Sequence, residues 1–364
     1  APPPRPSNCS NPEHPLRISA RCFPEAKAPK SFVGTTYRLP RMSVLISGSI
    51  AYDTILAYEG RFADKLRPEA ISHLNLTFPA ATMRRAFGGC AANIAYALKR
   101  LGGKPLLWSA MGKDAAPYMA RFRELGISTA GLLVLEDAWM PQAFITTDAA
   151  GNQLTTFHGG ALDRTQEVPF PDPAADPDVP LDAVTLAMLS PGGRIAMKRH
   201  AEICVERGIP YIFDVGQAAP LFTGDELAHF IAQAAMVAFS DYEAELIAGA
   251  SGIRPADMAR MGKTVFHTHG ARGSSVWLPG AVDPVPIEAA PIPGAAARDP
   301  VGAGDAYRGG LLYGLTAGLD PVQSARIASV MGALKVSTLG VQNYTTTLDD
   351  VRLRYEALWG KVTF

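Results

Sequence analysis

The stretch "RDPVGAGDAYRGGLLYGL", residues 298–315, joins a proline turn to an apolar-periodic run through three small residues. The periodicity after residue 305 predicts a helix. The first N–H groups of a helix have no partners within it, and the helix dipole adds partial positive charge there. Gly302, Ala303 and Gly304 therefore predict an anion hole that a phosphoryl group can approach closely.

A single carboxylate, Asp305, follows these small residues. Two anions repel each other, so Asp305 is not expected to bind the phosphoryl group itself. It is well placed to accept a proton from a substrate hydroxyl that attacks phosphorus. Taken alone, the same residues are also typical of a glycine turn followed by an acidic first helical turn, so the motif needs support from elsewhere in the chain.

A second loop-to-helix junction lies at Gly88-Gly89, within "AFGGCAANIAYALKRLGG". Asn93, in the first turn of that predicted helix, carries an amide that can donate to and accept from sugar hydroxyls. Asp53, after the first predicted strand, can accept hydrogen bonds from two adjacent hydroxyls. Each residue also has a plainer interpretation, Asp53 as a helix or turn cap and Asn93 as an exposed helical residue.

Apolar strands alternate with amphipathic helices along most of the chain, for example a strand over 104–112 and a helix over 116–126. This rhythm is typical of a parallel sheet with helices on both faces. We therefore predict an α/β fold with a central, mainly parallel sheet flanked by helices, whose ligand binds beyond the carboxyl ends of the strands. The other strand candidates are residues 43–49, 184–190, 209–215, 236–240, 264–270 and 274–280.

Two stretches break this rhythm, from about 70–89 and from about 130–160. Both alternate apolar and polar residues, and "DAAGN" at 148–152 is typical of a hairpin turn. Half-exposed strands do not fit inside a doubly wound core. We predict that they form a small β-sheet that stands off the main domain as a lid. A plain surface hairpin is the alternative.

Charge and composition exclude several classes of function. The 34 basic side chains are balanced by 34 acidic ones, so no basic excess points to nucleic acid or to a membrane surface. The chain has no run of about 18 apolar residues that would predict a membrane span. Four cysteines without a CxxC pair form no disulfide framework, which indicates the cytoplasm. The nearest approach to a metal cluster is "HTH" at 267–269, whose alternation we assign to two faces of a strand.

Residues 1–41 are rich in proline and lack apolar periodicity. They predict a flexible N-terminal extension that packs into no core. Met42 opens a buried-strand run, so we expect the folded domain to span 42–364. The acidic residues of the extension and its lack of an apolar segment argue against a secretory signal. Deletion of residues 1–41 is expected to preserve stability and activity.

Over residues 42–364 the chain resembles the ribokinase-like, PfkB-type carbohydrate kinases. "GGCAANIAYALKRLGG" is similar to the first signature of that family, and "DPVGAGDAYRGGLLYGL" to the second, which is more specific. "MGKD" at 111–114 looks like the G-x-D element between them, and "THGARG" at 268–273 resembles the nucleotide loop T-x-G-x-x-G. The resemblance implies a ribokinase-like fold and phosphoryl transfer from ATP, with Mg²⁺, to an alcohol group.

The resemblance also implies roles for individual residues. Asp305 would be the catalytic base, and Gly302, Ala303 and Gly304 the anion hole. The residues assigned to substrate hydroxyls are Asp53, Gly88, Gly89 and Asn93, and those assigned to the nucleotide are Ser240, Glu243, Thr268, Gly270, Arg272 and Gly273. Many members of the family respond to K⁺ or a similar cation, and carbonyls at or near Asp299, Val301, Lys335, Thr338 and Gly340 lie where that cation is usually bound.

One element departs from the family pattern. The family usually carries N-x-x-E after a strand, an element tied to Mg²⁺ and phosphate, and this chain has Ser240-Asp241-Tyr242-Glu243 there. Serine keeps a hydroxyl but loses the reach and the donor pair of the asparagine amide. We expect responses to Mg²⁺ and phosphate that differ from the family norm. A polar loop before a helix is the alternative.

The predicted lid bears on the choice of substrate, because a nucleoside brings a flat base that favours aromatic and apolar contacts. Its segments offer Phe78, Met83, Phe87, Trp139, Met140, Phe144 and Phe157, with Gln142 and His158 as candidates for hydrogen bonds to base edges. Alternatively, these side chains fill the seam between lid and core. "GNQLTTFHGGALD" resembles the corresponding strand of bacterial adenosine and nucleoside kinases.

We therefore favour an ATP-dependent kinase of purine nucleosides over a free-sugar kinase of the ribokinase or fructokinase type. A catalytically silent relative that senses a ligand is a third possibility, against which the retained Asp305 and glycine loop argue. The sequence ranks neither adenosine, inosine, guanosine nor cytidine. Exposed lid strands can pair between subunits, so a monomer and a homodimer are both compatible with the sequence.

Overall fold

The structure is a computed structural model that describes residues 43–66, 75–171 and 184–364. The predicted N-terminal extension, residues 1–41, lies outside the described residues, as does the start of the first predicted lid segment, 70–74. Within the described part, no helix is long and apolar enough to cross a membrane.

A large sheet has the strand order β13-β12-β11-β10-β9-β8-β1-β4-β5. Every pairing from β11 to β5 is parallel, and only β11–β12 and β12–β13 are antiparallel. The strands are β1 Ser43–Ser47, β4 Lys104–Gly112, β5 Leu132–Leu135, β8 Val184–Leu189, β9 Tyr211–Phe213, β10 Met236–Ser240, β11 Thr264–Thr268, β12 Ser274–Trp277 and β13 Val285–Ile287. The predicted mainly parallel sheet is confirmed.

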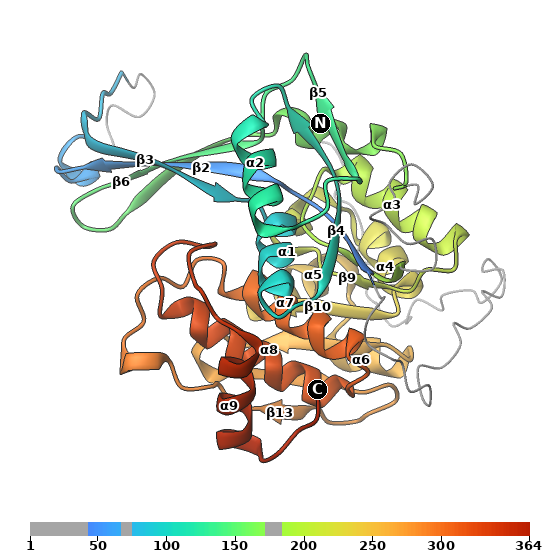
Figure 1. Ribbon diagram of the computed structural model, residues 1–364. Helices are drawn as coiled ribbons and strands as arrows, with labels where there is room; N and C mark the ends of the chain where they lie inside the picture. Colours follow the sequence, from blue (N-terminus) through green and yellow to red (C-terminus); the bar gives the residue numbers. More distant parts are fainter. Residues whose placement is uncertain (1–42, 67–74, 172–183) are drawn as a thin grey trace, which may run out of the picture. The chain divides into compact units, whose positions relative to one another are not determined.

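Helices cover both faces of this sheet (Figure 1). Along β1, Val44 and Ile46 pack into one apolar core and Leu45 into the other, as the two-residue period of a strand requires. The first core contains α1 Cys90–Arg100, α2 Ala116–Leu125, α7 Ala303–Thr316, α8 Pro321–Val336 and α9 Leu348–Trp359. The second contains α3 Arg194–Glu206, α4 Gly224–Gln233, α5 Asp241–Ser251 and α6 Pro255–Arg260. Short 3₁₀ helices are η1 Phe62–Asp64, η3 Gly160–Glu167, η4 Gly216–Leu221, η5 Gly270–Arg272 and η6 Pro293–Ala295.

A second, small sheet has the order β3-β2-β6-β7 and reaches out beyond α2 (Figure 1). Its strands are β2 Ala51–Tyr58, β3 Ala80–Gly88, β6 Gln142–Thr147 and β7 Gln153–His158. The hairpin β6–β7 is antiparallel and turns at residues 148–152, as predicted. All of β7 is exposed to solvent, so this sheet has no core of its own at that edge.

Two strands differ from the sequence-based assignment. β5, inside the predicted lid segment 130–160, pairs with β4 and extends the large sheet. β2 belongs to the small sheet and pairs with β3 along its whole length and with β6 over residues 52–57. The sequence "AYDTILAY" follows β1 after only three residues, and the sequence analysis assigns no separate strand to it.

The helix α7 runs through the middle of the first core and begins at the predicted junction. Gly302 caps it with a left-handed φ of 75°, a conformation that glycine adopts without strain. Further along, a Cβ on Gly309 would lie 2.3 Å from the Cβ of Ala97 in α1. The glycines after Asp305 thus let α7 pack directly against its neighbours, which fixes where its N-terminus lies.

Candidate active site

A cavity of about 970 Å³ lies where α1 and α7 begin and where the small sheet approaches them. A volume of this size is at the upper end for small-molecule sites. The sequence-predicted residues that line it are Asp53, Gly89, Asn93, Phe157, Glu243, Val301, Gly302, Gly304 and Asp305. The first-turn residues of both predicted loop-to-helix junctions therefore meet in one space.

Asp305 lies in the first turn of α7, where the Ala303 N–H donates to the Pro300 carbonyl over 3.1 Å. Its Oδ2 accepts a hydrogen bond of 2.9 Å from Nδ2 of Asn93. Burial raises the pKa of Asp305, although this hydrogen bond and the charge of Arg308 work against the shift. A carboxylate with a raised pKa is a stronger proton acceptor, as a general base requires.

A chain of hydrogen bonds runs from Asp305 to the glycine pair. The amide of Gln342 donates to Oδ1 of Asn93 over 2.9 Å and to the Tyr118 hydroxyl over 2.8 Å. Tyr118 donates in turn to the Gly88 carbonyl over 2.7 Å. Asn93 was predicted from sequence to face sugar hydroxyls, but the structure also gives its amide the task of orienting Asp305, which leaves one N–H for a ligand.

Asp53 lies on β2 opposite the start of α1. A Cβ on Gly88 would come within 2.4 Å of its Oδ2, so the glycine makes room for this carboxylate. Gly89 has a φ of 91° and caps α1. Burial, followed by the charge of Asp305, raises the pKa of Asp53 to about 6, while Arg84 opposes the shift. A proton or a set of hydroxyl donors is thus needed to stabilise Asp53 in this cavity.

The register of the small sheet decides which predicted lid residues reach the cavity. Asp53, Ala143 and Phe157 lie directly opposite one another on β2, β6 and β7, and all three line the cavity. Gln142 and His158 are their sequence neighbours and therefore point to the opposite face. Gln142 donates to the Thr54 hydroxyl over 2.5 Å. The expectation that Gln142 and His158 contact a base edge is not supported by this arrangement.

Of the seven apolar lid side chains predicted to contact a substrate, all within the described chain, only Phe157 lines the cavity. Phe87 packs on Tyr118 with ring centroids 4.7 Å apart, and Met140 is buried. Phe78 packs instead on Phe62. Phe87 and Met140 thus pack as in the alternative interpretation, which places such side chains between lid and core.

An ion pair that the sequence analysis missed lies beneath the anion hole. Arg308, in the second turn of α7, is bidentate on Asp214, with 2.5 Å from Nε to Oδ2 and 2.6 Å from Nη2 to Oδ1. Its Nη2 is also 3.6 Å from Glu243. Burial alone would lower the pKa of Arg308, but Asp214 raises it, so the guanidinium stays charged. The available signal was Asp214 itself, a carboxylate directly after the strand "YIF".

Ser240, which replaces the family asparagine, and Glu243, the retained glutamate, form a capping box at the start of α5. The Ser240 N–H donates to Glu243 over 2.6 Å, and the Ser240 hydroxyl accepts from the Glu243 N–H. Thr268 lies opposite Ser240 at the ends of β10 and β11. The predicted nucleotide loop Gly270–Gly273 follows at once, and Gly273 has a φ of 95°. The structure thus gathers this set at one end of the sheet, and Glu243 is its one member that lines the cavity.

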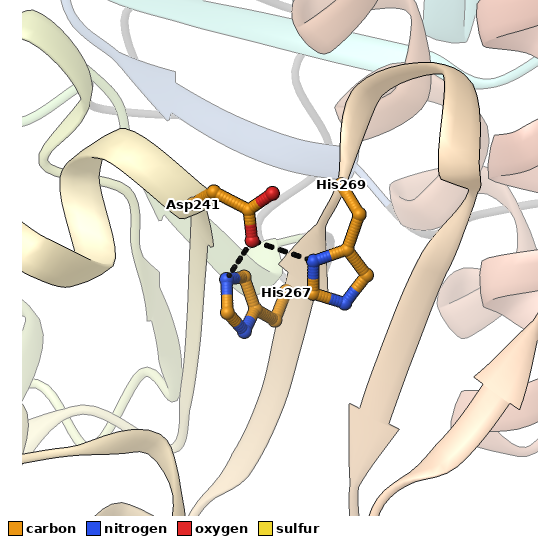
Figure 2. A group of neighbouring side chains, drawn as sticks. All are labelled: Asp241, His267 and His269. Atoms are coloured by element: carbon orange, nitrogen blue, oxygen red, sulfur yellow. Dashed lines mark hydrogen bonds and ion pairs between the residues drawn. The ribbon is translucent and has the colours of Figure 1, made fainter.

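His267 lies in β11, and His269 directly follows its last residue, Thr268. The two imidazole rings lie side by side, with centroids 4.3 Å apart, as expected for residues two apart along a strand. Both rings turn toward one oxygen of Asp241 (Figure 2), at 2.9 Å from His267 Nε2 and 2.6 Å from His269 Nδ1. Arg272 reaches the other oxygen at 2.6 Å. The predicted nucleotide-loop arginine is therefore held by Asp241.

The predicted cation loop is arranged differently from the expectation. Lys335 was expected to offer a carbonyl, but its ammonium lies 2.8 Å from the Asp299 carbonyl and 3.4 Å from the Thr338 carbonyl. Its own carbonyl accepts a hydrogen bond from the Thr338 N–H. Gly340 and Val301 donate N–H groups to the Asp299 carboxylate over 2.8 and 3.0 Å. These contacts replace the predicted ring of carbonyls.

Comparison with known proteins agrees with this geometry. The profile of the family described as "pfkB family carbohydrate kinase" matches residues 43–348. The chain belongs to the pfkB family of carbohydrate kinases. The resemblance stated from the sequence motifs, and the ribokinase-like fold that it implied, are thereby confirmed.

Several relatives of this pfkB-family chain are nucleoside kinases. The nucleoside kinase of Burkholderia thailandensis in complex with inosine is 39% identical and has a TM-score of 0.75, covering 87% of this chain and 98% of that one. Its complex with ADP-inosine is 40% identical with a TM-score of 0.72, covering 87% and 96%. The nucleoside kinase of Methanothermobacter thermautotrophicus is 29% identical over 284 residues, which are 76% of this chain and 87% of that protein.

Proposed function

We propose that this chain is an ATP-dependent nucleoside kinase that phosphorylates the ribose 5′-hydroxyl of purine nucleosides such as inosine, adenosine and guanosine. One observation carries the choice of substrate. A carboxylate suited to sugar hydroxyls, Asp53, and an aromatic ring suited to a base, Phe157, lie in one row across the small sheet and line one cavity. The similarity to an enzyme solved with inosine and with ADP-inosine supports the same substrate class.

In the proposed reaction, Asp53 and the remaining N–H of Asn93 hold the ribose hydroxyls and direct the 5′-oxygen toward Asp305. The 5′-oxygen bonds to the γ-phosphorus of ATP, and Asp305 accepts the proton that this hydroxyl loses. The bond between the γ-phosphorus and the oxygen of the leaving ADP breaks at the same time. The N–H groups at Gly302 and Gly304 stabilise the charge on the transferring group, while the Ala303 N–H holds the Pro300 carbonyl. The small sheet then acts as a lid that keeps water, a competing acceptor, from the phosphoryl group.

The nucleotide would lie beside Thr268, Gly270 and Gly273, with Arg272 exchanging Asp241 for a phosphate oxygen. Mg²⁺ prefers oxygen ligands and usually binds through one or two carboxylates together with substrate phosphates. Glu243 lines the cavity and has one oxygen that the Ser240 cap does not use, so it fits this role. The metal would neutralise phosphate charge.

A substrate panel tests the proposal. The purified chain is given ATP and Mg²⁺ with inosine, adenosine, guanosine, cytidine, ribose and fructose, and ADP release and product mass are followed. We expect the highest kcat/KM with a purine nucleoside and a 5′-monophosphate as product. Faster phosphorylation of ribose or fructose would replace this proposal with the free-sugar kinase, and no turnover with any acceptor would favour a silent ligand sensor.

A further inference from the structure

The loop before the anion hole contains a buried cation that belongs to the protein. The Lys335 side chain has no solvent exposure, and its ammonium faces three oxygens of the loop 298–301 and the turn 338–340. These are the Asp299 carbonyl at 2.8 Å, the Asp299 Oδ2 at 3.2 Å and the Thr338 carbonyl at 3.4 Å. Three acceptors match the three N–H bonds of an ammonium group.

The Lys335 ammonium occupies a position among these oxygens that a bound monovalent cation could otherwise fill. Lysine carries the same single charge as such an ion, in a compact head group. The head group also lies at the end of α8, where the helix dipole favours a positive charge. Burial lowers the pKa of Lys335, and the charge and hydrogen bond of Asp299 oppose that shift.

The same contacts occupy both oxygens of the Asp299 carboxylate. Oδ1 of Asp299 accepts the Val301 N–H, and Oδ2 accepts both Gly340 and Lys335. A second cation placed on the Asp299 and Thr338 carbonyls would stand against the ammonium at a few ångströms, and like charges repel strongly in a buried setting. The residues present therefore do not fit K⁺.

The ammonium also connects the loop to the catalytic helix. The N–H groups of Arg298 and Asp299 donate to the Val336 carbonyl at the end of α8, and Gly302 follows as the cap of α7. Lys335 thus ties together the end of α8, the loop 298–301 and the turn 338–340. The position of the N–H groups in the first turn of α7 depends on these three segments.

We infer that Lys335 is a built-in replacement for the monovalent cation, which makes phosphoryl transfer by this chain independent of K⁺. Lys335 is a positioning residue: it holds the loop that presents the anion hole and touches no reacting atom. The inference rests on the proposed kinase function where activity is measured. The second measurement, thermal melting, depends only on cation binding.

Wild-type protein is first freed of K⁺ and Na⁺ and assayed with inosine, using a Tris salt of ATP and choline chloride to keep the ionic strength constant while KCl replaces choline. Thermal melting is recorded in the same series. We expect kcat and the melting temperature to stay the same across the series. A stimulation of kcat by K⁺ of more than about fivefold over choline would overturn the inference, because it would require an ion site that Lys335 does not fill.

The variant Lys335→Ala then removes the ammonium and leaves the oxygens of Asp299 and Thr338 available to a cation. We expect kcat to fall by up to about 10²-fold, as for a small displacement of catalytic groups, and KCl to raise both kcat and the melting temperature relative to choline. Lys263→Ala is the matched control, since Lys263 also donates to two carbonyls, at 2.6 and 2.9 Å, but at the other end of β11. It should lose stability without a response specific to K⁺.

A folded Lys335→Ala that behaves like Lys263→Ala, with no ion-specific change in melting, reduces Lys335 to an ordinary structural lysine and overturns the replacement. If Lys335→Ala does not fold, Lys335→Gln is used, and the wild-type series still decides. Should the substrate panel show no nucleoside turnover, the melting series remains interpretable, so failure of the kinase proposal is distinguishable from failure of this one.

Discussion

The large sheet and the small sheet both contribute side chains to one cavity, but these side chains differ in burial and in the partners that hold them. The segments that follow the strands of the large sheet supply the buried pair Asp214 and Arg308 and the partly buried Asp305, each with a side-chain partner. The small sheet supplies Asp53, which is also partly buried, and Phe157, which is 54% exposed. Stabilising a transition state needs preorganised groups in a dry site, whereas admitting a substrate needs an element that can open. The difference indicates that chemistry is assigned to one sheet and substrate binding to the other.

Removal of the proposed base should have the largest effect. Asp305→Asn keeps the shape and an acceptor for Asn93 but cannot take the proton, so kcat should fall by about 10²–10⁴-fold. Asp225→Asn is the control, because Asp225 is an exposed carboxylate in the first turn of another helix, α4. Steady-state rates with inosine measure both. A kcat of Asp305→Asn within a few-fold of wild type would remove Asp305 from the chemistry.

Loss of the buried ion pair between Arg308 and Asp214 should lower the free energy of unfolding strongly. Arg308→Met strands Asp214 without its partner, and breaking a buried pair typically costs about 3–5 kcal/mol of folding free energy. Arg199→Met removes a pair of which both members are half exposed, and should cost at most about 1 kcal/mol. Urea unfolding compares the two variants. Equal losses would show that burial of Arg308 adds nothing to stability.

The small-sheet carboxylate should affect affinity rather than turnover. Asp53→Ala removes a charged acceptor for hydroxyls, and such hydrogen bonds contribute about 1.5–3 kcal/mol. We expect a higher KM for inosine, with a smaller rise in Asp53→Asn, which keeps one acceptor. If neither variant changes the KM, Asp53 is a structural cap and the hydroxyls are held elsewhere.

Phe157 should distinguish nucleosides from free sugars. Stacking on an aromatic side chain contributes roughly 1–3 kcal/mol per base, so Phe157→Ala should raise the KM for inosine and leave that for ribose nearly unchanged. Leu154→Ala is a matched control, since Leu154 is 43% exposed on the same strand but points to the other face. A KM increase for ribose as large as that for inosine would argue against a base-stacking role.

Acid should weaken substrate binding through Asp53. Its pKa of about 6 means that it carries a proton in the free enzyme below that pH. Inosine affinity should then fall by up to about tenfold per unit below pH 6. The same upward shift from 3.8 contributes stability below about pH 4 that is lost as the pH rises through about 6. Calorimetric affinities across this range, with Asp53→Asn as the pH-insensitive reference, measure the effect. An affinity that is flat down to pH 5 would contradict it.

Much of the large-sheet side was predictable, because its signals are local. The strand–helix rhythm gave the parallel sheet, and small residues before Asp305 gave the helix start that the structure places at Gly302. The small sheet was harder. β5 lies inside the predicted lid segment 130–160, yet it pairs with β4 in the large sheet. Which residues face the cavity depends on register: Phe157 lines it, whereas its neighbour His158 and the paired Gln142 lie on the opposite face.

Contacts between distant segments left no pattern in the sequence. The pair Arg308–Asp214 joins residues 94 positions apart, and Gln342 meets Asn93 across 249 positions. Lys335 ends an apolar helix where a lysine is ordinarily a solvent-exposed cap, and only the fold shows its ammonium turned inward. Such interactions depend on how α7 and α8 pack, which no single segment encodes.

The division of labour between the two sheets is tested most directly by calorimetric titration of inosine into Asp305→Asn and Phe157→Ala. The account predicts that Asp305→Asn binds inosine about as well as wild type, while Phe157→Ala binds it about 5–150-fold more weakly, as a loss of roughly 1–3 kcal/mol requires. Loss of binding in Asp305→Asn together with unchanged binding in Phe157→Ala would contradict it.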